Sequence, residues 1–423
     1  MNRDDLKQIL LDQQEMYLNL PAIERDVTLE DGVNYAFTGL RRSGKSYLMY
    51  QQIHQRVAGG TPADQIVYVN FEDERLLELT ASDLNTILEI ATELSASYGK
   101  PELFLDEIQN IKGWEKFARR LADTQYRVSI TGSNSRMLSS EIATTLGGRY
   151  MMHDVFPYSF SEYLKANDRL DLLSDRMTTT RRGELNHYFA SYLRYGALPE
   201  IAFLQAKKDY LSSIYQTIYL GDIVARNAVA NEFAMRLMIK KIAESVMRPL
   251  SYSRLTNILR SAGTSMGKDT VINYVNYIKN SYLLFQLENY AAKLVDKAVS
   301  PKYYFMDTGI LGLFLLNPET AQLENLVAVE LVRRYGYKEV FYFESANTEV
   351  DFYIPQENLA VQVSYNPRAS EETMNRELRA FSRLRRFMPG GANILITNSE
   401  EGIVNADEIS VQILPAWKWM LHF

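Results

Sequence analysis

The sequence contains no cysteine, which excludes disulfide bonds, cysteine-bound zinc and thiol catalysis together. Histidine is scarce as well, and the four histidines are widely separated, so we expect surface or packed side chains rather than metal ligands: His54, His153, His187 and His422. No apolar run approaches the length that a membrane-spanning helix needs. Acidic residues, Asp4 and Asp5, stand where a secretory signal needs an apolar core, so we expect a soluble, cytoplasmic protein.

An excess of positive charge is also missing. The 423 residues carry a formal net charge of −6, so any binding to nucleic acid must come from a local basic face. Hydrophobic residues make up 46% of the chain, which is enough to form several cores. This length and composition predict an ordered protein of two to four domains.

A phosphate-binding octapeptide is present early in the chain: Gly39-Leu40-Arg41-Arg42-Ser43-Gly44-Lys45-Ser46. It fits the pattern G-x-x-x-x-G-K-[ST], in which backbone N–H groups surround phosphates and the lysine reaches the β and γ phosphates. The final hydroxyl, here Ser46, holds Mg²⁺. A β-prone run at 33–37 precedes the loop and a helix-like stretch at 47–53 follows it. This setting predicts a nucleoside triphosphatase whose cofactors are ATP and Mg²⁺.

The next motif is an apolar strand at 103–105 that is followed directly by two acids. Asp106 would orient Mg²⁺ through its water shell, and Glu107 would polarise the water that attacks the γ-phosphate. An apolar run followed by two acids is common by itself. Its position after a phosphate loop makes a Walker B motif, and with it hydrolysis, the favoured interpretation.

Further candidates for the site lie near two later strands. Strand 128–132 leads into Ser133 and Asn134, either of which could hydrogen-bond the γ-phosphate or the attacking water. The alternative is a hydroxyl-rich turn that caps the next helix. Arg149, behind two glycines, is a candidate arginine finger acting within one subunit or across an interface, or else a partner in a structural ion pair.

The order of elements predicts an α/β fold. Short strands alternate with amphipathic helices, which is typical of a parallel sheet covered on both faces, at 33–38, 66–71, 102–106 and 127–132. Strands return near the C-terminus, at 340–343, 349–354, 359–363 and 393–396. We therefore predict four packed segments: an ATPase domain (1–160), a helical lid or connector (161–235), a winged helix (236–305) and a second α/β domain (306–423).

Taken together, these motifs resemble a prokaryotic family of AAA-type P-loop ATPases that are fused to a C-terminal domain of unknown function. The resemblance runs almost end to end and includes five further stretches, at 69–76, 131–134, 148–149, 156–163 and 192–200. It implies ATP binding and points to hydrolysis. The cellular task of the family is poorly defined, so the resemblance identifies no partner.

Residues 252–290 resemble a winged helix-turn-helix, with helices at 252–262 and 268–280. The second helix has an apolar stripe, and its other face carries the side chains that would enter a DNA groove: Lys268, Asn273, Asn276 and Lys279. Nearby lysines could line a wing or the neighbouring backbone track: Lys293, Lys297 and Lys302. The alternative is a packing module between the larger domains.

The C-terminal segment resembles the core of PD-(D/E)XK nucleases, which needs an acid on one strand and a D/E-x-K tripeptide on the next. A helix with Glu324 and Glu330 and a strand with Asp351 match this arrangement. Gln362 and Ser364 stand where the carboxylate and the lysine are needed. Because neutral groups bind Mg²⁺ weakly and supply no positive charge, we predict an inactive, restriction-endonuclease-like domain.

The sequence thus predicts an ATPase that couples its nucleotide state to DNA or protein binding, without a membrane. Two alternatives stay open. One is a nucleotide-gated regulatory module with little turnover, as in toxin–antitoxin or defence systems. The other is an active nuclease. A protein partner and a homo-oligomer are both compatible with the sequence.

Overall fold

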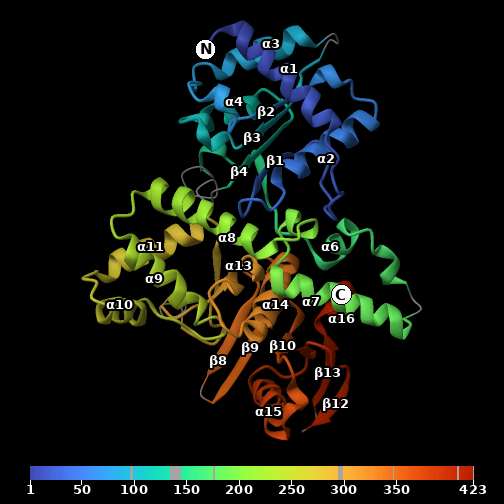
Figure 1. Cartoon of the computed structure of the whole chain (residues 1–423), viewed down its shortest axis with the longest axis vertical. Coiled ribbons are helices and arrows are strands. Elements are labelled where there is room, and N and C mark those ends of the chain that lie inside the picture. The colour runs from blue at the N-terminus through green and yellow to red at the C-terminus, as the bar shows by residue number, and fades with distance from the viewer. Residues whose placement is uncertain are drawn as a thin grey trace. The chain divides into compact units, whose positions relative to one another are not determined.

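The computed structural model divides the chain into two compact units, Met1–Pro157 and Tyr158–Phe423 (Figure 1). The structure describes residues 1–95, 99–133, 144–174, 177–293, 299–345, 347–406 and 409–422. Each unit builds its own sheet, so each is described by itself. The finer division of the chain into four segments stays a prediction.

The first unit is built on a parallel sheet whose strand order, over the described residues, is β2-β3-β4-β1-β5. Its strands are β1 (Asn34–Thr38), β2 (Ile66–Asn70), β3 (Glu102–Asp106), β4 (Val128–Gly132) and β5 (Tyr150–Asp154). The first four confirm the predicted strands. The sequence did not predict β5, because this strand lies at a sheet edge and leaves Met151 46% exposed, so it lacks a continuous apolar run.

Helices cover both faces of this sheet, as predicted: α1 (Arg3–Asn19), α2 (Lys45–Ala58), α3 (Leu84–Leu94) and α4 (Trp114–Asp123). Successive side chains of a strand point to opposite faces. Val67 therefore packs in one core with residues of α3 and α4, while its neighbour Tyr68 packs in another core with Leu48 and Ile53 of α2. Burial of both faces is typical of a parallel α/β sheet.

Across the described residues, no helix is long and apolar enough to cross a bilayer. Helices form most of the first half of the second unit. They are α6 (Phe160–Ala166), α7 (Thr179–Tyr195), α8 (Lys207–Thr217), α9 (Glu232–Ala243), α10 (Tyr252–Ser261) and α11 (Lys268–Asn280). A π-helical stretch, Ile218–Ala225, continues α8. An antiparallel ribbon of β6 (Leu284–Leu287) and β7 (Lys302–Phe305) follows α11.

The second half of this unit contains a mixed sheet with the order β12-β13-β11-β10-β9-β8 over the described residues. Its strands are β8 (Phe341–Ser345), β9 (Thr348–Ile354), β10 (Leu359–Val363), β11 (Asn393–Thr397), β12 (Gly402–Ala406) and β13 (Ile409–Pro415). The helices of this half are α13 (Thr308–Gly312), α14 (Glu319–Tyr335), α15 (Glu371–Phe387) and α16 (Ala416–His422). The structure confirms the four strands that the sequence predicted and adds β12 and β13.

Candidate nucleotide-binding site

The octapeptide connects the end of β1 to the start of α2, so the predicted strand–loop–helix setting is present. Gly39 and Gly44 have positive φ angles of 145° and 96°. A Cβ atom on Gly39 would lie 2.4 Å from the carbonyl oxygen of Val155, so no larger residue fits there. Arg42 also has a positive φ, 65°, which is uncommon for a residue other than glycine. The loop is held in a specific, partly strained conformation.

Lys45 lies over this loop and is only 5% exposed. Its Nζ donates hydrogen bonds to the carbonyl oxygens of Gly39 and Leu40, both at 3.2 Å. The same atom is 3.9 Å from Oε1 of Glu107. The ammonium group is therefore already inside the loop, next to the second acid that the sequence singled out.

Asp106 ends β3 and is 1% exposed. The hydroxyl of Tyr68 donates to its Oδ2 at 2.6 Å, and the hydroxyl of Thr131 donates to its Oδ1. Burial raises the pKa of Asp106, and the charge of Glu107 adds to this, whereas hydrogen bonds from Ser46, Thr131 and Tyr68 oppose the rise. The two residues predicted to hold Mg²⁺, Ser46 and Asp106, are thus brought together.

Glu107 follows directly and has a positive φ of 52°. Its backbone N–H donates to Thr131 Oγ1 at 2.8 Å, while its Oε2 accepts hydrogen bonds from the Gln109 amide and, at 3.2 Å, from the Ser133 N–H. Burial alone would raise the pKa of Glu107. The positive charge of Lys45 and the Gln109 hydrogen bond outweigh burial and lower it, so the carboxylate is held ionised.

Two buried hydroxyls at the site are unused. Ser43 Oγ and Ser133 Oγ have no hydrogen-bond partner among the residues that the structure describes. Buried polar groups nearly always have a partner, so such orphans call for an explanation. Phosphate oxygens and water would satisfy both hydroxyls. Together with the glycine loop, Lys45, Ser46 and Asp106, they form a donor set that fits a nucleotide with Mg²⁺.

The two remaining site predictions have different outcomes. Asn134 lies outside the described residues. Arg149 directly precedes β5, whose first residue pairs with Asn34 at the start of β1, so it lies at the amino edge of the sheet, about 15 Å from the loop. There it forms an ion pair with Asp123. The ion pair agrees with the structural alternative, and a role as an arginine finger, within one subunit or across an interface, stays a prediction.

Sequence reasoning missed two residues that organise the site. One is Tyr68, which was indistinguishable from other tyrosines in apolar runs. The other is Arg25, a 5% exposed arginine that donates to the carbonyl oxygens of Ser43 at 3.0 Å and Phe156 at 2.8 Å. No local motif surrounds Arg25. Its role depends on partners that are 18 and 131 residues away in the chain.

In the second unit, one lysine predicted to contact nucleic acid is fully buried and another is half-buried. Lys302 is fully buried, so its predicted contact with a DNA backbone is wrong. Lys279 is half-buried, and its Nζ donates to Gln286 Oε1 at 3.0 Å. Burial also lowers the pKa of Lys279. Of the other predicted contacts, Lys268, Asn273 and Lys293 are exposed, Asn276 is half-buried, and Lys297 lies outside the described residues.

Ser364 supplies no positive charge near Asp351, but Lys302 does so from β7. Its Nζ lies 3.2 Å from Glu349 Oε1, 3.6 Å from Asp351 Oδ1 and 3.9 Å from Glu324 Oε1. Burial raises the pKa of Glu324 to about 8, and the nearby charge of Asp351 adds to the shift. The sequence motif could not show this, since Lys302 belongs to β7 and not to the strand on which the motif requires a lysine.

The other residues predicted for the nuclease-like site do not all lie near Lys302. Gln362 lies at its border, where its amide donates to Glu377 Oε2 at 3.1 Å and its Oε1 accepts from the Asp351 N–H at 2.7 Å. Glu330 points elsewhere and pairs with Arg333 at 3.2 Å and Arg334 at 2.7 Å. Ser364 is buried.

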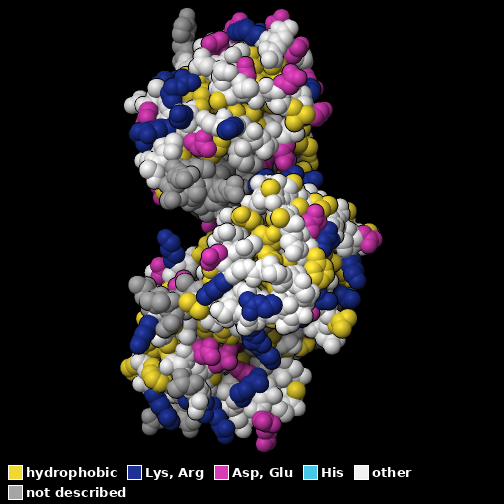
Figure 2. Space-filling view, turned by 90° about the vertical axis from the view of Figure 1, so that its left-hand side faces the viewer, with side chains coloured by type: hydrophobic (Ala, Val, Ile, Leu, Met, Phe, Trp, Pro, Cys, Tyr) yellow, Lys and Arg dark blue, Asp and Glu magenta, His cyan; other side chains and the backbone are white. Residues whose placement is uncertain are grey.

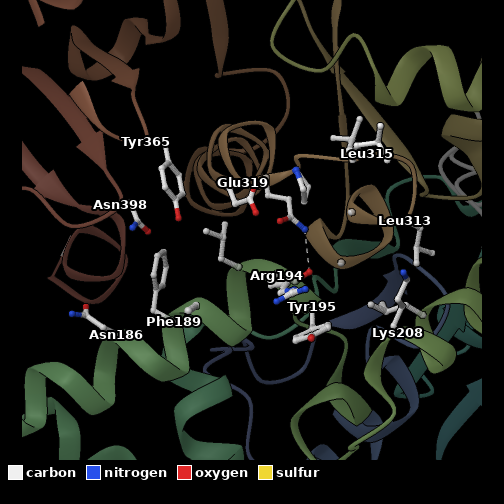
Figure 3. A pocket seen from close by; sticks show the side chains of 18 of the residues that line it. Asn186, Phe189, Arg194, Tyr195, Lys208, Leu313, Leu315, Glu319, Tyr365 and Asn398 are labelled. Carbon is white, nitrogen blue, oxygen red and sulfur yellow. Dashed lines mark hydrogen bonds between the residues drawn. The ribbon is translucent and has the colours of Figure 1, made fainter. Parts of the chain in front are cut away.

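A cavity of about 620 Å³ lies elsewhere in the second unit, between α7, α8, α13 and the loops after β10 and β11 (Figure 3). Arg194 and Tyr195 of α7 line it. The next residue, Gly196, packs so closely on Asp307 that an added Cβ would lie 2.2 Å from Asp307 Oδ1. The stretch 192–200 therefore joins α7 to the start of α13.

Comparisons with known proteins agree with this arrangement. Residues 34–164 match the model of an AAA domain, and residues 186–321 match a domain of unknown function (DUF8612). The chain is similar to an uncharacterised protein of Methanocaldococcus jannaschii, with 31% identity over 99% of this chain and 95% of that protein. It is also similar to an uncharacterised protein of Haemophilus influenzae, with 30% identity over 80% of this chain and 84% of that one.

Among solved structures, the chain is similar to a Walker-type ATPase of Pyrococcus abyssi, with a TM-score of 0.43 and 13% identity over 74% of this chain and 95% of that chain. Similarity this low transfers no activity. The two sequence relatives cover 99% and 80% of this chain, and the AAA match covers the β-strands and loops that form the site. The chain therefore belongs to one family with these uncharacterised proteins of M. jannaschii and H. influenzae, and its first unit is an AAA-type P-loop domain.

Proposed function

We propose that the first unit binds ATP with Mg²⁺ and hydrolyses it. One observation carries the proposal: Lys45 of the loop, Asp106 at the end of β3 and Glu107 beside it converge within one buried site. A loop that only bound phosphate would need the lysine but no carboxylate beside it. The ionised, buried Glu107 next to it supplies a group that can accept a proton.

In this proposal the chain's own groups divide the work. Loop N–H groups and Lys45 bind the phosphates, and Ser46 and Asp106 hold Mg²⁺. When bound, Mg²⁺ neutralises negative charge on the phosphates. Glu107 orients the attacking water and takes its proton, for which it must exchange the hydrogen bond from Gln109 for one to water. Ser133 is close enough to Glu107 to help fix its carboxylate.

Tyr68 is predicted to position Asp106 rather than to take part in the chemistry. A Tyr68→Phe variant loses the 2.6 Å hydrogen bond to Oδ2 and keeps the packing of the ring. Loss of a partner that orients a metal ligand typically weakens metal binding about 10-fold or more. We expect a rise of that size in the Mg²⁺ concentration that gives half-maximal ATP hydrolysis.

Tyr50 offers the matched control for this measurement. Its hydroxyl lies 3.1 Å from that of Tyr68, one step farther from Asp106. A Tyr50→Phe variant should leave the Mg²⁺ dependence within about two-fold of the unmodified protein, because the bond to Asp106 is kept. Equal behaviour of the two variants would show that Tyr68 does not position this carboxylate.

The coupling of nucleotide state to the second unit is part of the proposal. Arg25 links the carbonyl oxygen of Ser43, in the phosphate loop, to that of Phe156, next to the end of the first unit. A change in the loop on ATP binding would therefore act on the segment that leads into the second unit. We propose that α10, α11 and the β6–β7 ribbon form a winged helix there, which contacts DNA or protein.

A nucleotide-gated module with little turnover is the alternative, and the hydrogen bonds that hold Glu107 to Gln109 and Ser133 favour it. The two proposals differ in the number of ATP molecules that one protein consumes. Several turnovers per minute with any added DNA support an ATPase that works in cycles. A single slow turnover supports the gated module.

We further propose that the restriction-endonuclease-like site is inactive. The Lys302 ammonium already lies among Glu324, Glu349 and Asp351, where a divalent cation would have to bind, and Gln362 adds a neutral amide. Two cations that close would repel each other. We expect no nicking of supercoiled DNA with Mg²⁺ or Mn²⁺. Nicking that disappears in an Asp351→Ala variant would overturn the proposal and support an active nuclease.

A further inference from the structure

Four of the five arginines of helix α15 follow one another at intervals of three, four and three residues: Arg376, Arg379, Arg383 and Arg386. At 3.6 residues per turn, this spacing places all four on one side of the helix. All four are exposed, and the side chain of Arg376 is 73% accessible. They extend over ten residues, or about 15 Å along the axis. We call this side the arginine face.

Folding of the helix does not require this face. The opposite side, with Leu378, Phe381 and Leu384, packs into the core of the sheet. Cations in a last turn interact favourably with the helix dipole, which accounts for Arg386. The other three lie earlier in the helix, where the dipole favours them much less. Neither packing in the core nor the helix dipole accounts for the alignment of these three.

The charges on the arginine face are poorly compensated. Arg376 pairs with Glu377 at 2.6 Å, and Arg383 donates to the backbone oxygen of Asn347. For Arg379 and Arg386, the part of the chain that the structure describes contains no ion pair. Glu372 lies on the same side near the start of the helix, and Glu349 lies near Arg376.

Neighbouring arginines of the face are three or four residues apart, a spacing at which like charges repel each other. The repulsion destabilises the free protein, and the binding of an anionic partner relieves it. On the side of the molecule that Figure 2 shows, positive and negative side chains are mixed. A chain with a net charge of −6 needs a local face of this kind to bind a polyanion.

We propose that the arginine face of α15 binds the sugar–phosphate backbone of nucleic acid. Guanidinium groups bind phosphate oxygens in pairs, so each arginine can hold one phosphate. The face, about 15 Å long, is long enough to contact several phosphates of a duplex, which carries one charge per strand for every 3.4 Å of its axis. Contacts to phosphates carry no sequence information, so the face binds without strong sequence preference. The inference does not depend on ATP hydrolysis by the first unit.

The test compares binding of a fluorescently labelled 20-base-pair duplex by the full chain and by a triple variant, Arg379→Gln, Arg383→Gln and Arg386→Gln, from 50 to 200 mM KCl. Every arginine that no longer neutralises a phosphate should reduce the slope of log K against log salt by about 0.9. We expect a slope lower by two to three and an affinity at least 10-fold weaker at 100 mM. Removal of the repulsion should also leave the thermal midpoint unchanged or higher, which shows that the variant folds.

A matched control removes three exposed positive charges outside α15, Lys112→Gln, Lys116→Gln and Lys338→Gln, and should bind like the unmodified chain. Equal DNA binding by the triple arginine variant and the unmodified chain would overturn the proposal. So would loss of binding in Lys268→Gln but not in the arginine variant, since the site would then lie on α11. Binding of poly-glutamate or of vesicles with 30% phosphatidylserine, but of no DNA, would assign the face to a different anionic partner and also overturn it.

Discussion

A Glu107→Gln variant is expected to bind ATP as tightly as the unmodified chain but to hydrolyse it about 100- to 10,000-fold more slowly, the range for loss of a general base. The amide keeps the shape of the side chain and its contacts with Ser133. It cannot accept a proton from water, and it no longer carries the negative charge that faces Lys45. Bound, unhydrolysed ATP should therefore accumulate on the protein.

Glu102 provides a control in the same strand. It is the first residue of β3, whereas Glu107 follows the last one. Oε1 of Glu102 lies 3.3 Å from Nε of Arg56. A Glu102→Gln variant changes the net charge equally and should hydrolyse ATP at the unmodified rate. Filter retention of labelled ATP and release of labelled phosphate measure the two quantities in parallel. If Glu107→Gln hydrolyses ATP at the unmodified rate, another group activates the water.

A Lys45→Ala variant is expected to lose ATP affinity by about 100-fold or more. Hydrogen bonds to charged groups contribute about 1.5–3 kcal/mol each, and the ammonium group can make two of them to the β and γ phosphates. About 3 kcal/mol or more corresponds to at least two powers of ten in the dissociation constant. Titration calorimetry with ATP and Mg²⁺ measures this directly.

The matched control for this variant is Lys112→Ala, an exposed lysine of the same unit, which should leave the affinity unchanged. Removal of Lys45 also removes the positive charge that holds the pKa of Glu107 down, so burial is left to raise it. The variant should therefore show a Glu107 carboxyl that titrates at higher pH. Unchanged ATP affinity would mean that the nucleotide does not bind at this loop.

Local signals in the sequence were sufficient for the central part of the site. The octapeptide and the acids after β3 are contiguous, and the carboxyl ends of parallel strands necessarily meet at one edge. Their convergence could therefore be predicted once the strands were recognised. Edge strands such as β5 and β12 were missed, since only one of their sides is paired and their residues are less apolar.

Residues that act through distant partners could not be predicted. Arg25 binds carbonyl oxygens of two separate segments, and Tyr68 reaches an aspartate 38 positions away. Lys302 is the clearest case. On sequence it was one of several lysines near a predicted DNA-binding helix, and only the fold shows that it is buried among three carboxylates.

The central claim is that the phosphate loop, Asp106 and Glu107 form one hydrolytic site. Release of phosphate from ATP by the purified full chain, measured with Mg²⁺, with EDTA and for Glu107→Gln, tests it most directly. The account predicts release that requires Mg²⁺ and is at least 100-fold slower in the variant, with ATP still bound. Hydrolysis that persists in EDTA or in the variant, or its absence from the unmodified chain that binds ATP, would contradict the account.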